Sequence, residues 1–261
     1  MRLEKVDMTF GRVQALSQID FAVGRNEIVG LIGDNGAGKS TLIKIVSGVL
    51  KPTTGDVWVR DRHIDPREYS VRMAHDLRIE TVHQGSSLGE KQPLWRNLFV
   101  GRQIVGRFGF IDVKKEKQIA NELLRQAIGF RGQGINAEST VRDLSGGERQ
   151  GIAIARAMHF EADLIVLDEP TTALAINEVR KVLAFVEGVK AAGRACIYIE
   201  HNLAHVHEIA DRLVILDRGR VVRSFSKGEI TLAELTSHMI SLWSLTSFLL
   251  ERRCRGCFLS D

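Results

Sequence analysis

The spacing of apolar residues along this chain changes repeatedly from strand-like to helix-like. Compact apolar runs occur at Ile28–Ile32, Leu164–Leu167, Ala195–Ile199 and Leu213–Leu216. Such runs are typical of strands buried on both faces. Between the later runs, residues 177–192 have apolar positions at helical spacing, which predicts an amphipathic helix. Strands that alternate with helices predict an α/β fold with a mainly parallel sheet, flanking helices and right-handed crossovers.

The N-terminal segment has a different pattern. Residues 1–32 contain partly alternating apolar positions that are interrupted by a turn at Gly11-Arg12. A turn cluster at Lys51–Asp56 precedes a short strand at Val57–Val59. These pieces predict a small antiparallel β layer beside the main sheet. Further along, 66–78 is expected to be helical and Ile79–His83 to be another strand.

Residues 86–143 change character and predict a mostly helical insertion. Ile119, Leu123, Leu124, Ala127 and Ile128 repeat at helical spacing. Asp112 is a suitable N-cap for that helix, and the glycine-rich stretch from 101 to 109 is expected to be irregular. With the helix that follows Leu144, the helical subdomain should cover about 86–160.

The strongest chemical signal is Gly33-Asp34-Asn35-Gly36-Ala37-Gly38-Lys39-Ser40, called the phosphate loop below. It has the pattern G-x-x-x-x-G-K-[ST] between an expected strand and an expected helix beginning near Thr41. Glycines allow backbone N–H groups to approach an anion closely, and the helix N-terminus faces the phosphates. Lys39 should reach the β- and γ-phosphates, and the Ser40 hydroxyl should hold Mg²⁺. A Gly-rich turn with a chance lysine is the weaker alternative, because both flanking elements are in place.

A second turn that could bind an anion occurs at Ser145-Gly146-Gly147, which opens another helix. One nucleotide does not need two such sites in one chain. The turn is therefore either an ordinary helix cap or a site offered to the nucleotide of another subunit.

Acidic residues follow two of the buried runs, where ligands bind in open α/β sheets. Asp168 is placed to contact the Mg²⁺ shell, and Glu169 to orient or deprotonate an attacking water. A solvated strand end is the alternative for this acidic pair. His201 follows the strand at Ala195–Ile199, and we favour a γ-phosphate contact over a purely structural histidine.

Composition excludes several classes of protein. The net charge of +4 is spread along the chain without the basic stripe of a nucleic-acid binder. No run reaches the roughly 18 apolar residues of a membrane span, and no signal peptide is visible. The three cysteines do not suggest a disulfide framework. Cys254 and Cys257 have C-x-x-C spacing but lack a second ligand pair, so a metal or redox role is not favoured.

Taken in order, the phosphate loop, Gln84, Leu144–Gln150, Leu164–Pro170 and His201 resemble the ATP-binding subunit of an ABC transporter. The resemblance covers residues 1–240 and leaves 241–261 as an atypical tail. Stretches such as Ile79–Gln84 and His201–Val206 also look like the branch that powers bacterial uptake of sugars such as ribose and fructose.

The resemblance implies a role for each site residue. Phe10 would stack on adenine, Gln84 would sense Mg²⁺ and the attacking water, Glu169 would be the general base, and His201 would contact the γ-phosphate. The metal would be held by Ser40, Gln84 and Asp168. The nucleotide would be bound by Phe10, Gly33, Asp34, Asn35, Gly36, Ala37, Gly38, Lys39, Ser40 and Thr41, with Ser145, Gly146 and Gly147 reaching the nucleotide of the opposing subunit.

The implied cofactors are ATP and Mg²⁺. The implied partners are a second ATP-binding subunit in a head-to-tail dimer, transmembrane permease subunits gripped by the helical subdomain, and indirectly a periplasmic substrate-binding protein. The expected location is peripheral, at the cytoplasmic face of the bacterial inner membrane, with no nucleic-acid partner.

Departures from the family pattern keep alternatives open. Glu148 stands where Gln is common, and Glu200 stands where Ser usually precedes the histidine. A carboxylate at 200 could repel phosphate, so a regulatory cassette with little turnover is one alternative. A soluble ABC ATPase acting on ribosomes or DNA would usually have two cassettes or a long coiled coil, and a GTPase would have an Asn-Lys-x-Asp motif; neither pattern is found.

Overall fold

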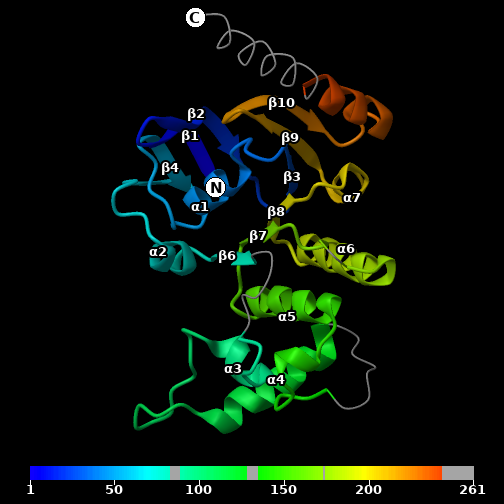
Figure 1. Cartoon of the computed structure of the whole chain (residues 1–261). Helices are drawn as coiled ribbons and strands as arrows, with labels where there is room; N and C mark the ends of the chain where they lie inside the picture. Colours follow the sequence, from blue (N-terminus) through cyan, green and yellow to red (C-terminus); the bar gives the residue numbers. More distant parts are fainter. Residues whose placement is uncertain (83–88, 128–134, 173, 243–261) are drawn as a thin grey trace, which may run out of the picture.

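The structure is a computed structural model that describes residues 1–82, 89–127, 135–172 and 174–242 (Figure 1). Two sheets form its upper part in this view. The smaller sheet is antiparallel, and its strands in spatial order are β2 (Val13–Ala22), β1 (Arg2–Phe10), β4 (Thr54–Val59) and β5 (Arg62–Ile64). The expected antiparallel layer is therefore confirmed. β4 begins three residues earlier than the expected strand, because Thr54 and Asp56 pair with Asp7 and Glu4 of β1. The strand β5 was not expected.

The larger sheet holds the buried apolar runs. Its strands in spatial order are β10 (Arg220–Ser226), β9 (Arg212–Asp217), β3 (Ile28–Ile32), β8 (Ala195–Ile199), β7 (Leu164–Asp168) and β6 (Ile79–Val82). Five of these strands are parallel, and β10 pairs antiparallel with β9 at one edge. This confirms the mainly parallel sheet.

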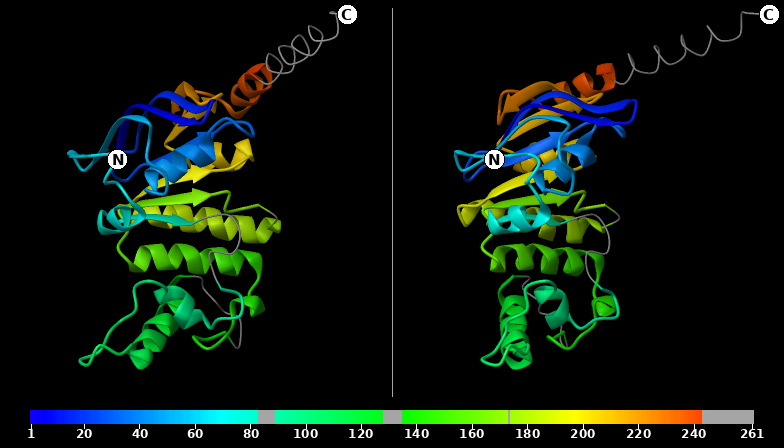
Figure 2. Two further views of the ribbon diagram at one scale, coloured as in Figure 1. Left: turned by 60° about the vertical axis from the view of Figure 1, so that its left-hand side comes forward. Right: turned by 90° about the vertical axis from the view of Figure 1, so that its left-hand side faces the viewer.

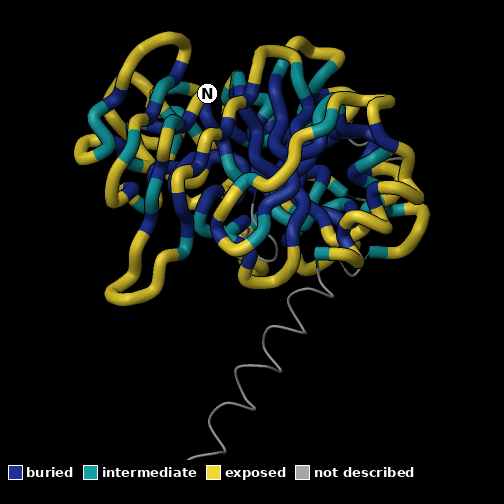
Figure 3. The backbone as a smooth tube through the Cα atoms, turned by 90° about the horizontal axis from the view of Figure 1, so that it is seen from above, coloured by how far each residue is buried: buried dark blue, intermediate teal, exposed yellow. Residues whose placement is uncertain are grey.

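Both faces of the larger sheet are covered, which explains why its strands lack a polar face. Val29 and Leu31 belong to the core shared with the antiparallel sheet and α1. Ile28 and Ile32, on the opposite face, pack in a second core with residues of α5, α6 and α7. Figure 3 shows the buried tube running through the centre of the molecule, with the exposed loops around it.

The described helices and their bounds are α1 (Lys39–Val46), α2 (Val71–Asp76), α3 (Leu94–Phe99), α4 (Val113–Ala127), the 3₁₀ turn η1 (Val141–Asp143), α5 (Gly146–His159), α6 (Ile176–Ala191), α7 (Leu203–Ile209) and a closing helix from 232 to 242. The helix expected over 66–78 is shorter, and that expectation is corrected. Ser70 caps α2, and the residues before it form a turn in which buried Tyr69 donates its hydroxyl to the Val46 carbonyl oxygen at 2.6 Å.

The insertion between β6 and α5 has a hydrophobic cluster of its own. Leu94, Leu98 and Phe99 of α3 pack with Leu124 of α4 and Ile152 of α5. Asp112 caps α4 as expected, since its Oδ1 accepts from Lys115 N at 3.0 Å. Figures 1 and 2 show α3 and α4 at the end of the molecule farthest from the antiparallel sheet, with α5 between them and the larger sheet. Ile128 and the tail from 243, with Cys254 and Cys257, lie outside the described residues.

Sheet topology determines where polar residues can meet. β3, β8 and β7 are neighbours and parallel, so their carboxyl ends lie at one edge of the sheet. Gly33, Glu200 and Glu169 are the first residues after those ends. This edge is where ligands bind in such folds.

Candidate active site

The phosphate loop joins β3 to α1 and bends tightly around its own backbone. Gly36 and Gly38 have φ of +81° and +107°, a region that favours glycine. A Cβ on Gly33 would lie 2.4 Å from the Leu216 carbonyl oxygen, so only glycine fits against β9 there. The Ala37 amide donates to the Asp34 carbonyl at 3.1 Å. The sequence therefore forms the close turn that leads into the N-terminus of α1.

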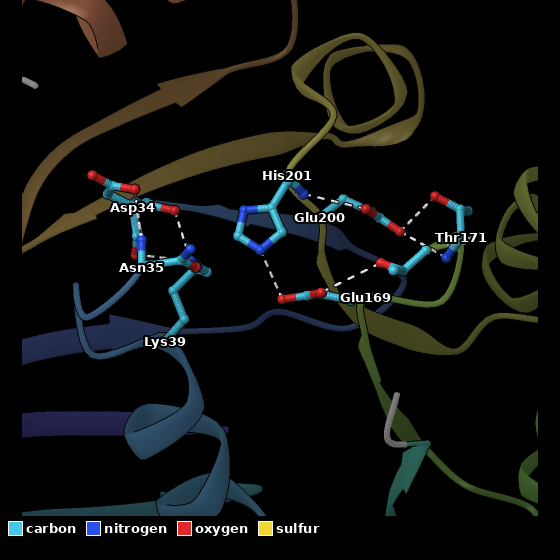
Figure 4. A network of polar contacts seen from close by, with 9 residues as sticks. Asp34, Asn35, Lys39, Glu169, Thr171, Glu200 and His201 are labelled. Carbon is cyan, nitrogen blue, oxygen red and sulfur yellow. Dashed lines mark hydrogen bonds and ion pairs between the residues drawn. The ribbon is translucent and has the colours of Figure 1, made fainter. Parts of the chain in front are cut away.

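Lys39, the first residue of α1, points back over this loop (Figure 4). Its ammonium group donates to the carbonyl oxygens of Gly33 at 2.6 Å and Asp34 at 3.0 Å. Burial lowers the pKa of Lys39 below its ordinary value, and the negative charges of Glu169, Asp34 and Asp168 act in the opposite direction. The lysine is thus a cation held next to acidic groups, at a position where it can bind phosphate oxygens.

A cleft of about 430 Å³ opens above the loop. It is lined by loop and α1 residues together with Glu169 and two segments distant in sequence, namely Val13, Gln14, Ala15, Asp34, Asn35, Gly36, Gly38, Lys39, Ser40, Thr41, Glu169, Arg218 and Gly219. Sequence reasoning missed the contributions of 13–15 and 218–219. The Gly219 amide donates to the Ala37 carbonyl at 2.8 Å, which attaches the β9–β10 turn to the phosphate loop.

Glu169 and His201 form a direct pair at the cleft (Figure 4). His201 Nε2 lies 2.8 Å from Glu169 Oε1, and Thr172 Oγ1 donates to Glu169 Oε2 at 3.3 Å. The Glu169 backbone has a φ of +50°, and its amide donates to the Ile199 carbonyl at 3.0 Å. A carboxylate and an imidazole in contact opposite a phosphate loop can accept and move a proton of a bound water.

Oxygen atoms suited to a magnesium ion are present at the same edge. Ser40 lines the cleft, and Asp168 is close enough for its charge to act on Lys39. Among the described residues there is no cluster of three or more His, Cys, Asp or Glu side chains that could hold a metal alone. Mg²⁺ in sites of this kind uses few protein ligands together with phosphate and water oxygens, so these residues fit that ion.

Glu200 does not face the cleft. It is 4% exposed, and its Oε1 accepts from the amide and the hydroxyl of Thr171 at 2.7 and 2.6 Å. Its Oε2 accepts from the His201 amide at 3.2 Å. The carboxylate therefore binds the loop after Glu169. Repulsion of phosphate would require it to approach the phosphate loop, and it does not.

Ser145, Gly146 and Gly147 are not among the residues of the cleft. They open α5, where Ser145 and Glu148 form a reciprocal cap: Ser145 N donates to Glu148 Oε2 at 2.8 Å, and Glu148 N to Ser145 Oγ at 3.3 Å. This explains a glutamate at 148, since an N3 carboxylate completes a capping box. The structure thus keeps the second turn apart from the phosphate loop.

The structure does not place two of the predicted site residues, Phe10 and Gln84, in the cleft. Phe10 ends β1, is 46% exposed and pairs with Val13, which lines the cleft, but Phe10 does not line it. Its stacking role stays a prediction. Gln84 lies outside the described residues.

A second cavity, of about 620 Å³, lies at the opposite edge of the sheet. Ile79, Leu164 and Ala195 at its wall are the first residues of β6, β7 and β8. Although it is larger, neither the phosphate loop nor the Glu169–His201 pair contributes to it. The smaller cleft therefore holds the chemistry.

The cleft's parts are those of a nucleotide site, and sequence comparison identifies the family. A family model described as ABC transporter matches residues 16–172, more than half of the chain. The chain belongs to the ABC transporter family. The xylose/arabinose import ATP-binding protein of Sulfolobus acidocaldarius is 38% identical over 92% of this chain and 94% of that protein. The fructose import ATP-binding protein of Rhizobium meliloti is 36% identical over 88% of this chain and 89% of its own length.

Other similarities agree with this assignment. The ribose import ATP-binding protein of Caldanaerobacter subterraneus is 32% identical over 92% of this ABC chain, which spans 47% of that longer protein. Among solved structures, a nucleotide-free ATP-binding cassette has a TM-score of 0.79 at 24% identity and covers 93% of this chain and 97% of its own. A dimeric cassette bound to ADP and phosphate has a TM-score of 0.72 and covers 88% and 99%. These structures show that the fold is that of an ATP-binding cassette.

Proposed function

We propose that this chain is the ATP-hydrolysing subunit of an importer for a sugar, acting peripherally at the cytoplasmic face of the bacterial inner membrane. The observation that carries the proposal is the contact between His201 and Glu169, because Glu169 lines the cleft that also contains the phosphate loop. Within the described residues, no helix is long and apolar enough to cross a membrane.

Each residue has a proposed part in hydrolysis. The loop amides, Lys39 and the N-terminus of α1 bind the phosphates, and Ser40 and Asp168, with Gln84, hold Mg²⁺. When bound, Mg²⁺ neutralises charge that develops on the phosphate oxygens. Glu169 orients water and takes its proton, and His201 keeps the carboxylate in place and faces the terminal phosphate. Phe10 stacks on the base beside Val13.

We also propose a head-to-tail dimer. Ser145, Gly146 and Gly147 present a helix N-terminus outside the cleft of their own chain. In such a dimer each cleft would receive these groups from the opposing subunit, as the second anion-binding turn predicts. The dimeric cassette among the similar structures supports this arrangement.

The surface proposed for the permease lies on the helical subdomain, for which we retain the bounds 86–160. Residues 104–112 form a hairpin, the apolar hairpin, which is closed by Asp112 N donating to the Ile104 carbonyl at 2.7 Å. Phe108 and Phe110 are 84% and 79% exposed at its tip. Val105 and Ile111 of the same hairpin are also exposed, and exposed apolar patches of this kind mark interaction sites. Buried Glu116 of α4 accepts from Ile104 N at 2.8 Å and fixes the hairpin to its helix.

A sugar cargo is supported by the names of the relatives, which import xylose, arabinose, fructose and ribose. Cargo contacts would lie in the permease and in a periplasmic substrate-binding protein. The first test is Mg²⁺-dependent ATP hydrolysis by the chain together with its membrane partner in vesicles, with each sugar inside or outside. Turnover that no sugar uptake accompanies would contradict the import proposal.

A further inference from the structure

Glu200 is a buried carboxylate next to the Glu169–His201 pair that the proposed chemistry does not use. It follows β8 directly, whereas Thr171 lies two positions after Glu169 in the loop that follows the neighbouring strand β7. Both residues are almost fully buried, at 4% and 7% exposure. Three donors converge on the carboxylate: Thr171 N, Thr171 Oγ1 and His201 N. In Figure 4, Glu200 points toward Thr171 and away from Lys39, with Glu169 and His201 between them.

We propose that Glu200 is a positioning residue for hydrolysis, which sets the Glu169 carboxylate and the His201 imidazole relative to each other. This inference rests on the proposed function, because it assigns Glu200 an action through those two groups. Glu200 itself touches neither the cleft nor the reacting atoms.

Hydrogen bonds link the loop after β7 to the loop after β8 at several points. Glu169 N donates to the Ile199 carbonyl, and His201 Nε2 meets Glu169 Oε1. Glu200 adds to these links by binding the backbone of Thr171 on one side and that of His201 on the other. Because His201 is adjacent to Glu200 in the chain, movement of one loop relative to the other must break the hydrogen bonds that Thr171 donates to Glu200. Misplacement of a catalytic group by a fraction of an ångström is enough to slow a reaction that depends on alignment.

Only a carboxylate satisfies this site. Each Glu200 oxygen faces a backbone N–H, Oε1 that of Thr171 and Oε2 that of His201. Glutamine has one acceptor oxygen and one NH₂ group, so in either orientation it places a donor against a backbone donor. Glu200→Gln has nearly the same size and shape, and it therefore tests the hydrogen bonds with little change in packing.

The experiment measures kcat and KM for ATP, together with thermal unfolding, in the chain assembled with its membrane partner. For Glu200→Gln we expect kcat to fall about tenfold and KM to change less than about twofold, because the loss acts on alignment after ATP has bound. Thr171→Val removes the hydroxyl, which donates to Glu200 Oε1 at 2.6 Å and lies 3.5 Å from His205 Nδ1. It should lower kcat by roughly threefold, while Thr171→Ser should restore it. Combining Thr171→Val with Glu200→Gln should lower kcat no further than Glu200→Gln alone, since both changes act on one interaction.

Asp211→Asn is the matched control. Asp211 also accepts from a backbone amide, Ile28 N at 2.9 Å, and joins separate elements, but it lies outside the cleft. We expect it to lower the melting temperature and leave kcat of the folded protein unchanged. If Asp211→Asn lowers kcat as much as Glu200→Gln, the effect is general destabilisation and the inference is overturned.

Glu169→Gln separates failure of the inference from failure of the proposed function. Full kcat in Glu200→Gln with turnover lost in Glu169→Gln overturns the positioning role alone. Full kcat in Glu169→Gln overturns the proposed chemistry itself. If Glu200→Gln does not fold, Thr171→Val decides: unchanged kcat in that variant overturns the inference, and a reduced kcat rescued by Thr171→Ser supports it.

Discussion

His201 Nε2 lies 2.8 Å from Oε1 of Glu169, although the residues are 32 positions apart and follow different strands. Their side chains meet because β7 and β8 are parallel neighbours whose carboxyl ends lie at one edge of the sheet. The imidazole is 46% exposed and the carboxylate 20%, and of the two residues it is Glu169 that lines the cleft. The geometry suits a carboxylate that takes a proton while the imidazole fixes its orientation.

Glu169→Gln should therefore keep ATP binding and lose turnover. A positioned general base contributes roughly 10²–10⁴-fold to rate, so we expect kcat to fall by at least about 100-fold. Binding should persist because Lys39 and the loop amides are unchanged. Glu187→Gln on the exposed face of α6 is a suitable control. Single-turnover hydrolysis and a nucleotide-binding assay measure the two properties separately, and full hydrolysis by Glu169→Gln would refute the assigned role.

Lys39→Ala, in contrast to Glu169→Gln, should weaken the binding of ATP. Its ammonium group donates to two loop carbonyls and is expected to bind phosphate oxygens, and a hydrogen bond to a charged group is worth about 1.5–3 kcal/mol. We expect the dissociation constant for ATP to rise roughly 10- to 100-fold. Lys44→Ala is the matched control, because Lys44 lies further along the same helix, in its last turn, and is exposed. Titration with a fluorescent ATP analogue would show the difference; equal affinities in both variants would contradict the assignment.

The phosphate loop could be read from the sequence because its geometry is local. Glycines, lysine and serine in fixed order determine a turn whose contacts lie within six residues, such as Lys39 to Gly33. The strands of the larger sheet could also be predicted, since burial on both faces leaves a continuous apolar run in the sequence. The paired positions of Asp168, Glu169 and His201 followed from the topology of parallel strands.

Other parts of the site could not be predicted because they depend on tertiary packing. Arg218 and Gly219 reach the cleft only because β9 lies beside β3. The direction of the Glu200 side chain is set by Thr171, 29 positions away, so the sequence could suggest a carboxylate near phosphate but not that it turns elsewhere. The expected helix over 66–78 was too long because the side chain of Tyr69 is buried against α1, which favours a turn.

Acid should weaken the link between the larger sheet and the helical subdomain. Glu80 of β6 is buried, which raises its pKa, but hydrogen bonds and charges from His75 and Arg102 outweigh burial, so its pKa is lowered overall. His75 Nδ1 lies 3.0 Å from Glu80 Oε1, and Arg102 pairs with the same oxygen. Burial lowers the pKa of nearby Arg156, and the charge of Glu80 opposes that effect.

A pKa lowered by folding stabilises the protein above the unfolded value of about 4.3, and this contribution is lost as the pH falls through the folded value. We expect the free energy of unfolding to decline on acidification from about pH 5 downward, and Glu80→Gln to be less stable at neutral pH but to have a flatter pH dependence there. Urea unfolding at several pH values tests this. Parallel pH curves for the two proteins would show that Glu80 makes no such contribution.

The apolar hairpin provides the last test, which concerns the permease. Replacing Phe108 and Phe110 by Asp puts charge on the two most exposed aromatic side chains of the hairpin, which are 84% and 79% exposed and distant from the phosphate loop. If a permease covers them, desolvating two carboxylates in the interface should prevent stable association. ATP binding should be unchanged, because the cleft residues are intact. Ile240→Asp, at an exposed position of the closing helix with 55% exposure, is the control for added charge. Co-purification with the membrane partner measures association, and retention of the double variant on the permease would exclude the hairpin from that contact.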